Sequence, residues 1–426
     1  MKNSRMLVLG FGLICILGQI CLAGGTTSAL KPGDFVAVCG DSITFQRLYS
    51  VFIEDYFIMC QPAKSLRVLQ VGKGGEVAQG FLGWMKQKVL SFHPTAATTC
   101  FGMNDGGYVA FDPAHAALYR TSQKEIVQTF KKSGVRLIVL GSPGCVDSFT
   151  YRNSPEQAVI YNKTLGQFKE IDRQIAKEEG IAFANVHDLM MEVMAKAKAK
   201  YGKTYPLAAD GVHPGPNGHL VMAYAFLKAL GCDGDIGTIT LDLASGKANT
   251  TAGHKIISTD NVSVTVESSR YPFCFFGDPK SPDATRGVIE FFPFNREMNR
   301  FLLVVKGADP HAKYKMTWGK FSKDFSGVEL SNGINLADEF LDNPFCESFR
   351  KVEQAIQDKQ KREAKLMKVL LNAIPAFREY LLPEDTTILD QLLAKLIKRD
   401  TIMADTVSKS VVPLRHTICL ERTDKK

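Results

Sequence analysis

The chemistry that this sequence could carry begins at one short loop. Residues 36–47 read VAVCGDSITFQR, an apolar run that ends in Gly40-Asp41-Ser42. All three residue types favour turns, but a serine placed where a buried strand ends can also act as a nucleophile. Because a neutral hydroxyl is a poor nucleophile, Ser42 would need a base, an acid that orients the base, and donors for a developing oxyanion.

A base and its orienting acid can come from a second stretch, DGVHP at residues 210–214. An Asp three residues before a His, on a loop stiffened by Gly and Pro, can direct both side chains toward one point. His213 would take the Ser42 proton, and Asp210 would hold the imidazole tautomer and stabilise its positive form. The spacing alone also fits an ordinary polar loop.

Two other histidines and one other serine are alternatives. His187 lies beside Asp188, but neighbouring side chains on an extended segment point in opposite directions, so we expect this pair to act together poorly. His219 begins an apolar helical pattern and is expected to be buried, hydrogen-bonded and structural. Ser142, on a strand-end loop of its own, is the alternative nucleophile.

Donors for an oxyanion are expected on the loops that follow other strands. Gly75 can bring a backbone N–H close because it has no side chain, and Asn104 offers a side-chain amide. The backbone N–H of Ser42 is the third donor. Each such donor lowers a barrier by roughly 3–4 kcal/mol. Which of Gly72, Gly74 and Gly75 supplies the second donor stays open.

The elements that would position these loops alternate between residues 35 and 230. Short apolar runs typical of buried strands are followed by amphipathic helical patterns. This alternation predicts βαβ units and a mostly parallel sheet covered on both faces, in which ligands bind beyond the carboxyl ends of the strands. The expected strands are Phe35–Cys39, Leu66–Val71, Ala97–Phe101, Val135–Leu140 and Ile181–Val186.

The pattern changes after Gly231. Segments rich in β-forming residues and separated by Gly, Pro and Asp predict a small, mainly antiparallel accessory domain. Residues 348–398 are charge-rich with a helical period, which predicts two long helices that fold back on the body. The expected accessory strands are Thr238–Leu243, Val262–Val266, Gly287–Phe292, Phe301–Val305 and Tyr314–Thr317.

The composition is that of a globular protein with more than one domain. The chain has 426 residues, of which 45% are hydrophobic and 23% charged, which excludes large-scale disorder. The net charge of +8 comes mainly from one basic helical stretch, for which a solvated helix face is the simpler interpretation. We therefore expect no nucleic-acid partner.

The first residues have the features of an export signal. Lys2 and Arg5 precede an apolar run at residues 6–16, and Cys21-Leu22-Ala23 offers a small-residue cleavage site. The run is too short for a membrane span of about 20 residues, so we expect export to a periplasm or beyond, with no stable membrane insertion after cleavage. The remaining cysteines lie singly, without metal-ligand spacing, and their disulfide pairing cannot be inferred from the sequence.

Taken in order, these motifs resemble the four sequence blocks of the SGNH, or GDSL-type, hydrolases. The resemblance covers residues 33–230 and implies a flavodoxin-like three-layer α/β/α sandwich and an esterase activity without metal or cofactor. It implies Ser42 as the nucleophile, His213 as the base with Asp210, and an oxyanion hole of Ser42, Gly75 and Asn104. The second block departs from the usual pattern, since Gln70-Val71 stands where an Asn is common. The blocks are Gly40-Asp41-Ser42, Gly75, Gly102-x-Asn104-Asp105 and Asp210-x-x-His213.

We therefore divide the chain into a signal peptide (1–23), an SGNH-type hydrolase domain (24–232), a β-rich accessory region (233–346) and a C-terminal helical region (347–426). The expected function is that of an exported serine esterase that deacylates a small-molecule or polysaccharide ester, with an acetylated carbohydrate as the leading substrate. A lysophospholipase-like lipid or thioester hydrolase and a non-catalytic glycan-binding protein are the alternatives. Gln46 and Arg47 are candidates for substrate contact, but the substrate-binding residues and the oligomeric state are unknown.

Overall fold

The computed structural model describes residues 30–382 and 386–424. The expected signal peptide, residues 1–23, lies outside these residues. No helix in the described part of the chain is long and apolar enough to cross a membrane.

The centre of the molecule is a five-stranded sheet whose strands are all parallel. Its order is β2-β1-β3-β4-β5, so the first strand lies inside the sheet and the chain moves outward in both directions from it. Every residue of β1 is buried, as expected for a strand covered on both faces. The strands are β1 (Phe35–Gly40), β2 (Arg67–Gly72), β3 (Ala96–Cys100), β4 (Leu137–Gly141) and β5 (Ala182–Ala184).

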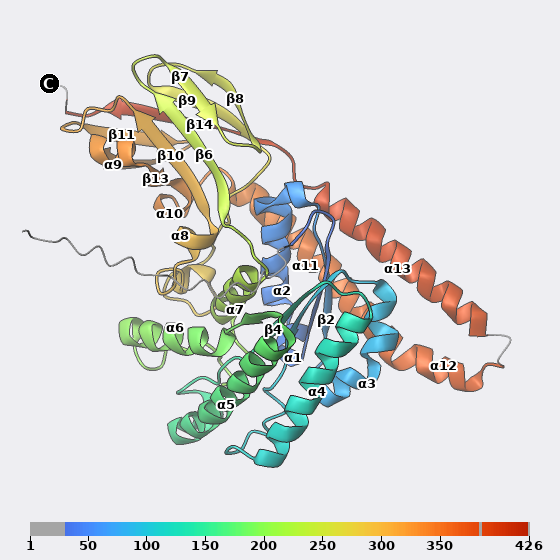
Figure 1. The fold of residues 1–426 in the computed structure, drawn as a ribbon. Helices are drawn as coiled ribbons and strands as arrows, with labels where there is room; N and C mark the ends of the chain where they lie inside the picture. The colour runs from blue at the N-terminus through green and yellow to red at the C-terminus, as the bar shows by residue number, and fades with distance from the viewer. Residues whose placement is uncertain (1–29, 383–385, 425–426) are drawn as a thin grey trace, which may run out of the picture.

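Helices cover both faces of this sheet, and the alternation of side chains along the strands feeds two cores. Val36 and Val38 belong to the core under α2, α6 and α7, whereas Ala37 and Cys39 belong to the core under α3, α4 and α5. The expected three-layer α/β/α sandwich is confirmed (Figure 1). The helices are α1 (Ser42–Phe45), α2 (Leu48–Asp55), α3 (Ala78–Lys88), α4 (Pro113–Lys132), α5 (Pro155–Glu179), α6 (Val186–Tyr201) and α7 (Pro216–Ala229), with a π-helical turn (Tyr56–Cys60) after α2.

The accessory region contains two further sheets, ordered β13-β10-β6-β7 and β12-β11-β14-β9-β8. Phe301 of β10 lies 6.0 Å, centroid to centroid, from Trp318 of β11, so the two sheets pack face to face. Most pairs are antiparallel as expected, but β6 and β10 are parallel. The strands are β6 (Asp235–Asp242), β7 (Lys247–Thr250), β8 (His254–Thr259), β9 (Ser263–Ser268), β10 (Arg300–Lys306), β11 (Lys313–Trp318), β12 (Phe321–Ser326), β13 (Ile334–Asn335) and β14 (Leu414–Arg422), with short helices α8 (Phe294–Met298), α9 (Gly327–Asn332) and α10 (Leu336–Glu339).

Two expectations for this half of the chain are wrong. Residues 287–292 form no strand. A short 3-10 helix, Thr285–Gly287, ends at the first of them, and the rest form turns and bends. The region 347–426 was expected to be helical, but it is not helical throughout, because residues 414–422 form the strand β14. This strand lies between β9 and β11, in the middle of an accessory sheet.

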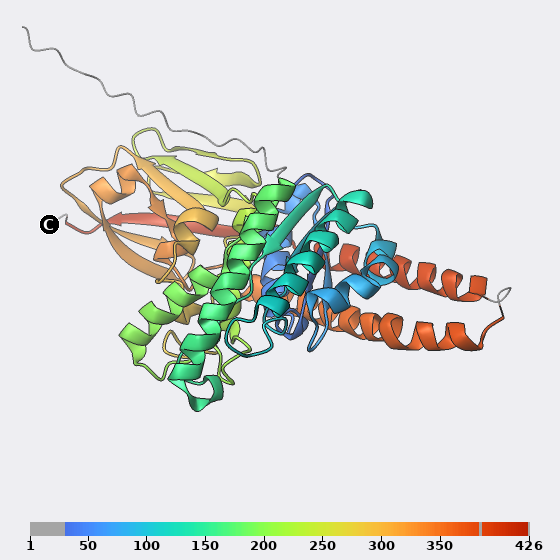
Figure 2. The ribbon, with the colours of Figure 1, turned by 60° about the horizontal axis from the view of Figure 1, so that its bottom comes forward.

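In the sequence, the predicted helices lie between β13 and β14, and so between two segments that both belong to the accessory sheets. They are α11 (Cys346–Lys368), a π-helical turn (Val369–Ala373), α12 (Ile374–Tyr380) and α13 (Thr386–Ser408). Helix α11 packs against α2 and β2, where the Lys359 ammonium is fully buried and lies 2.8 Å from Glu54 and 2.6 Å from Glu363. Figures 1 and 2 show the end of the α12–α13 pair projecting from the sandwich on the side opposite the accessory sheets.

Candidate active site

Ser42 lies at the start of α1, immediately beyond the carboxyl end of β1. The Asp41 side chain caps this helix by accepting the backbone N–H of Ile43 at 2.9 Å, which is the usual role of Asp at this position. The cap turns the chain sharply and leaves the Ser42 side chain at the rim of the sheet, facing the loop that carries His213.

Ser42, His213 and Asp210 form one continuous chain of hydrogen bonds. His213 Nε2 lies 2.8 Å from Ser42 Oγ, and His213 Nδ1 lies 2.7 Å from Asp210 Oδ2. The other oxygen of Asp210 accepts the backbone N–H groups of Val212 and His213 at 2.9 and 2.7 Å. The short Asp-x-x-His spacing therefore fixes the acid and the imidazole against each other within a single turn.

The hydrogen bonds around Asp210 keep its carboxylate charged. Partial burial acts to raise its pKa, but the backbone N–H groups of His213 and Val212 and the His213 side chain outweigh that effect and lower the pKa below its ordinary value. A charged carboxylate at this position stabilises a neighbouring imidazole that gains a proton.

Contacts from the loop after β4 hold the His213 loop in place. Gly211 has a φ of +88°, and a Cβ there would lie 2.3 Å from Tyr151 Cα, so this position requires glycine. Asp147 accepts the Leu207 backbone N–H at 2.8 Å and the Lys198 ammonium at 3.0 Å. The sequence analysis missed Asp147, whose only local signal is its position just after a strand-end loop.

The candidate oxyanion donors lie on the three loops named by the sequence. Within the described residues, the backbone N–H groups of Ser42, Gly74 and Gly75 form no hydrogen bond with another protein atom. Gly75 has a φ of +67°, which lets a tight turn present its N–H outward. The Asn104 amide donates to the carbonyl of Glu76 at 2.9 Å, so the second and third loops are joined directly.

Residues around Asn104 fix the direction of its amide. The Tyr108 hydroxyl donates to Asn104 Oδ1 at 2.8 Å, so the amide oxygen is occupied, and the nitrogen keeps one N–H besides the one that it donates to Glu76. Glu76 is buried and is held in turn by Trp84 Nε1 and the Lys73 ammonium, both at 2.7 Å. Each of these supporting residues is close in the sequence to the group that it holds, with Tyr108 four residues after Asn104, but they were not identified from the sequence.

Two carboxyl groups lie beneath these loops, that of the buried Asp41 and that of the half-buried Asp105. Asp105 accepts the backbone N–H groups of Ala78 and Gly102 at 2.8 and 2.9 Å, and so ties the start of α3 to the loop after β3. Burial raises the pKa of Asp105 to about 6. Burial also raises the pKa of Asp41 to about 7, and the nearby Asp105 adds to the rise.

The rival residues have structural surroundings. His219 is fully buried and receives the Tyr49 backbone N–H at 3.2 Å, and burial lowers its pKa to about 3. The Ser142 hydroxyl is buried and accepts the backbone N–H groups of Val186 and His187 at 3.0 Å each. His219 thus has the buried, hydrogen-bonded surroundings that were expected of it. Ser142, the alternative nucleophile, instead accepts hydrogen bonds from the start of α6.

The expectation that the side chains of His187 and Asp188 point in opposite directions is wrong. His187 and Asp188 lie in the first turn of α6 rather than on an extended segment, and their side chains do meet, with Nδ1 3.1 Å from Oδ1. His187 Nε2, however, is 3.2 Å from the carbonyl of Asn162 and is buried. Both ring nitrogens are thus occupied by the protein.

Of the candidates for substrate contact, Gln46 is turned toward the protein. Its Oε1 atom is 2.9 Å from His219 Nε2. Arg47 has a φ of +67° and donates to the Phe45 carbonyl at 2.9 Å. A different cation stands at the rim: the exposed Arg152 lies over the rings of Tyr108 and Tyr151, at 6.0 and 5.3 Å.

Comparison with known proteins places the hydrolase-type domain in a family. Residues 38–221 match the GDSL-like lipase/acylhydrolase family. An acetylxylan esterase of Geobacillus stearothermophilus is 24% identical over 221 residues, which are 49% of this chain and 95% of the relative.

Two solved structures are similar to this chain. A gut microbial diltiazem-metabolizing enzyme has a TM-score of 0.71 at 21% identity, over 94% of this chain and 100% of that one, so its fold includes the accessory region. The acetylxylan esterase of Geobacillus stearothermophilus has a TM-score of 0.39 at 21% identity, over 47% of this chain and 96% of its own. By the family match over residues 38–221, this part of the chain is an SGNH/GDSL-type hydrolase domain, and the chain is a carboxylic ester hydrolase.

Proposed function

We propose that the chain is an exported serine esterase that removes acyl groups, chiefly acetyl groups, from carbohydrate esters through an acyl-enzyme. The observation that carries the catalytic part is the hydrogen-bond chain from Ser42 through His213 to Asp210, with distances of 2.8 and 2.7 Å. Nucleophilic catalysis needs a base within hydrogen-bond distance of the nucleophile and a third group that orients the base.

The reaction follows from this arrangement in two halves. His213 Nε2 accepts the Ser42 proton as the hydroxyl attacks the ester carbonyl, and Asp210 holds the resulting imidazolium. The negative charge on the carbonyl oxygen develops among the backbone N–H of Ser42, the backbone N–H of Gly75 and the amide of Asn104. His213 then returns its proton to the leaving alcohol.

The second half releases the acyl group. Water takes the place of the alcohol and gives a proton to His213, and the resulting hydroxide attacks the acyl-enzyme. The same donors hold the oxyanion, and Ser42 recovers its proton from the imidazole as the acid departs. Every proton passes through one nitrogen, His213 Nε2, so one correctly oriented imidazole serves both halves.

The polar character of the rim supports a carbohydrate ester over a lipid ester. Tyr108 and Arg152 lie between the loop of Asn104 and the loop of His213: Tyr108 bonds Asn104 at 2.8 Å, and Arg152 lies over the Tyr108 ring. A phenol and a guanidinium offer hydrogen bonds to sugar hydroxyls and carbonyls. The acetylxylan esterase relative supports the same substrate class.

Labelling with a fluorophosphonate serine probe tests the catalytic proposal. We expect wild-type protein to be labelled, and Ser42→Ala and His213→Ala to lose both labelling and ester hydrolysis while remaining folded by circular dichroism. Ser142→Ala and His187→Ala are the matched controls and should keep labelling. Full labelling of Ser42→Ala would remove Ser42 as the nucleophile, and an unlabelled wild type would favour a non-catalytic glycan-binding protein.

A panel of esters tests the substrate class. Activity should be highest on acetylated xylo-oligosaccharides, and should fall from acetyl to longer acyl groups on p-nitrophenyl esters. A maximum with long-acyl or lysophospholipid substrates would favour the lipid hydrolase instead. Export is tested separately by N-terminal sequencing of the protein recovered outside the cytoplasm, which we expect to begin near residue 24.

A further inference from the structure

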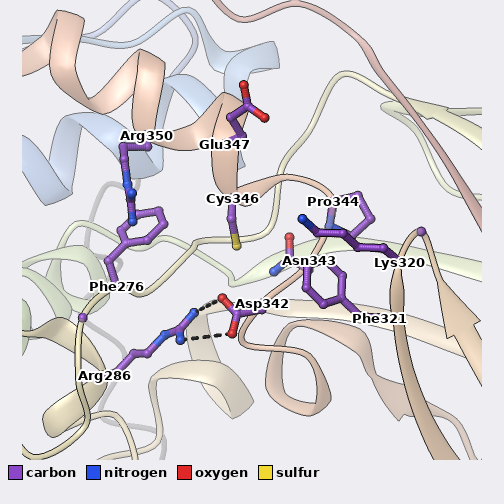
Figure 3. A pocket seen from close by; sticks show the side chains of 12 residues that line it. Phe276, Arg286, Lys320, Phe321, Asp342, Asn343, Pro344, Cys346, Glu347 and Arg350 are labelled. Carbon is purple, nitrogen blue, oxygen red and sulfur yellow. Dashed lines mark hydrogen bonds and ion pairs between the residues drawn. The ribbon is translucent and has the colours of Figure 1, made fainter.

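A cavity of about 610 Å³ lies in the accessory region, where the loop after β9 meets the start of α11. Figure 3 shows it between Phe276 and Arg350 on one side and Lys320 and Phe321 on the other. Ser42, Asp210 and His213 are not among its lining residues, so the cavity is separate from the candidate active site. Its floor carries a thiol, Cys346.

Cys346 is one of two cysteines that meet at this point. Its sulfur points into the cavity (Figure 3), and it is the first residue of α11. Cys274 is only 2% exposed, and the two thiols lie close enough for each to affect the pKa of the other. Both also reach one turn: Cys274 Sγ is 3.8 Å from Asn343 Oδ1, and Cys346 Sγ is 3.5 Å from the Leu341 carbonyl.

The surroundings make the two thiols chemically unequal. Cys346 receives the hydrogen bond of Cys274, begins a 23-residue helix and lies near the Arg286 guanidinium, and its pKa falls below the ordinary value despite partial burial. Burial and the neighbouring Cys346 raise the pKa of Cys274 well above its ordinary value. Cys346, which lines the cavity, is therefore placed as the attacking sulfur, and the buried Cys274 as the second sulfur; the directions of their pKa shifts agree with this order.

We propose that Cys346 and Cys274 form a thiol–disulfide exchange site, with Cys346 as the attacking sulfur, Cys274 as the resolving sulfur, and a small anionic disulfide such as glutathione disulfide as the oxidant. The arrangement places the attacking sulfur where a small molecule can reach it and hides the second sulfur directly behind. Neither role depends on the ester hydrolase site.

The exchange balances without any other reactant. The Cys346 thiolate attacks one sulfur of the small disulfide, whose S–S bond breaks and releases one small thiolate. Cys274 then gives up its proton and attacks the Cys346 sulfur, and the second small thiol leaves with that proton. The protein loses two electrons as its two thiols become one disulfide, and the small disulfide gains them.

The charge of the cavity selects the oxidant. Arg350 lies 4.3 Å from the centroid of the Phe276 ring, and Lys320 stands across the cavity. In the part of the chain that the structure describes, neither cation belongs to an ion pair, whereas Arg286 is held by Asp342 at 2.6 Å. The two acidic residues of the lining are paired with cations, Asp342 with Arg286 and Glu347 with Lys351 at 2.6 Å, so Lys320 and Arg350 favour a disulfide that carries carboxylates.

Mass spectrometry of the intact protein under non-reducing conditions tests the proposal. After incubation with glutathione disulfide, wild-type protein should lose two hydrogen atoms, and digestion should yield one cross-link, between Cys274 and Cys346. Cys274→Ser should accumulate a glutathione adduct at Cys346, and Cys346→Ser should form neither adduct nor cross-link. Cys419→Ser, at an exposed cysteine of β14, is the matched control and should behave as the wild type.

Three results would overturn the proposal. They are free thiols at both positions in treated wild-type protein, a cross-link to any other cysteine, and a Cys274→Ser protein without an adduct at Cys346. The wild-type cross-link does not depend on how well a variant folds, which circular dichroism and ester hydrolysis check independently. Neutral hydroxyethyl disulfide should react more slowly than glutathione disulfide, and Arg350→Gln should reduce that difference; equal rates in the wild type would refute the role of charge.

Discussion

The carboxyl group of Asp41 should make the stability of this protein fall as pH rises. Its side chain is buried beneath Ser42, and burial raises its pKa from 3.8 to about 7. A folded-state pKa above the unfolded value means that folding takes up a proton, so the full stability is present below the ordinary pKa and is lost as pH rises through about 7. At about 1.4 kcal/mol for each pKa unit, the difference between 3.8 and about 7 corresponds to about 4 kcal/mol.

Asp41→Asn removes this titration but keeps an oxygen that can accept the Ile43 N–H, now 2.9 Å away. Urea unfolding between pH about 4 and about 8 should show wild-type protein losing up to about 4 kcal/mol more than the variant. Asp242→Asn is the control, since Asp242 also accepts a backbone N–H, from Ala244 at 2.9 Å, but is only partly buried and has a lowered pKa. Parallel loss of stability in wild type and Asp41→Asn would refute the reasoning.

Three further variants test single contacts. Asn104→Ala should lower kcat on an acetyl ester by roughly 10²–10³ with a smaller change in KM; a raised KM at unchanged kcat would make Asn104 a substrate-binding residue. Gly211→Ala should lower the melting temperature and the activity, because its φ is +88° and its Cβ would meet Tyr151 Cα at 2.3 Å. Gly83→Ala, where a Cβ meets nothing within 4 Å, is its control and should not lower the melting temperature. Lys359→Met should cost about 3–5 kcal/mol in urea unfolding, because it leaves two buried carboxylates without their cation; an unchanged midpoint would contradict that pairing.

The parts of the fold that the sequence predicted are those fixed by local information. The first four strands of the parallel sheet are apolar runs that lead into a glycine-bearing loop, so their positions and type were predictable to within about two residues. The Asp210–His213 contact was predictable for the same reason, since three residues of spacing hold both groups in one turn. Gly75 and Asn104 were readable because each follows a strand of that sheet.

The parts that could not be predicted depend on contacts between distant segments. Asp147 supports the site through hydrogen bonds from Lys198 and Leu207, 51 and 60 residues further along the chain, and no periodicity marks a residue of that kind. The contact between His187 and Asp188 was not predicted, because neighbouring side chains on an extended segment point in opposite directions. The two residues lie instead in α6, which begins one residue before His187, at Val186. β14 was not predicted because it comes shortly after a charged helical stretch and is only nine residues long, which makes its alternation of buried and exposed residues hard to recognise.

The position of β14 has a consequence for how the protein is made. Its His416 bonds Ser268 of β9 across 148 residues of chain, and β9 and β11 are joined only through it. During synthesis, the edges of β9 and β11 that pair with β14 stay unpaired until α11, α12 and α13 have been made and β14 follows. Strands left open in this way pair with other chains, and contacts of such long range form slowly. A nascent chain stalled before residue 414 should therefore depend on chaperones, while its parallel sheet, complete by residue 184, has already assembled.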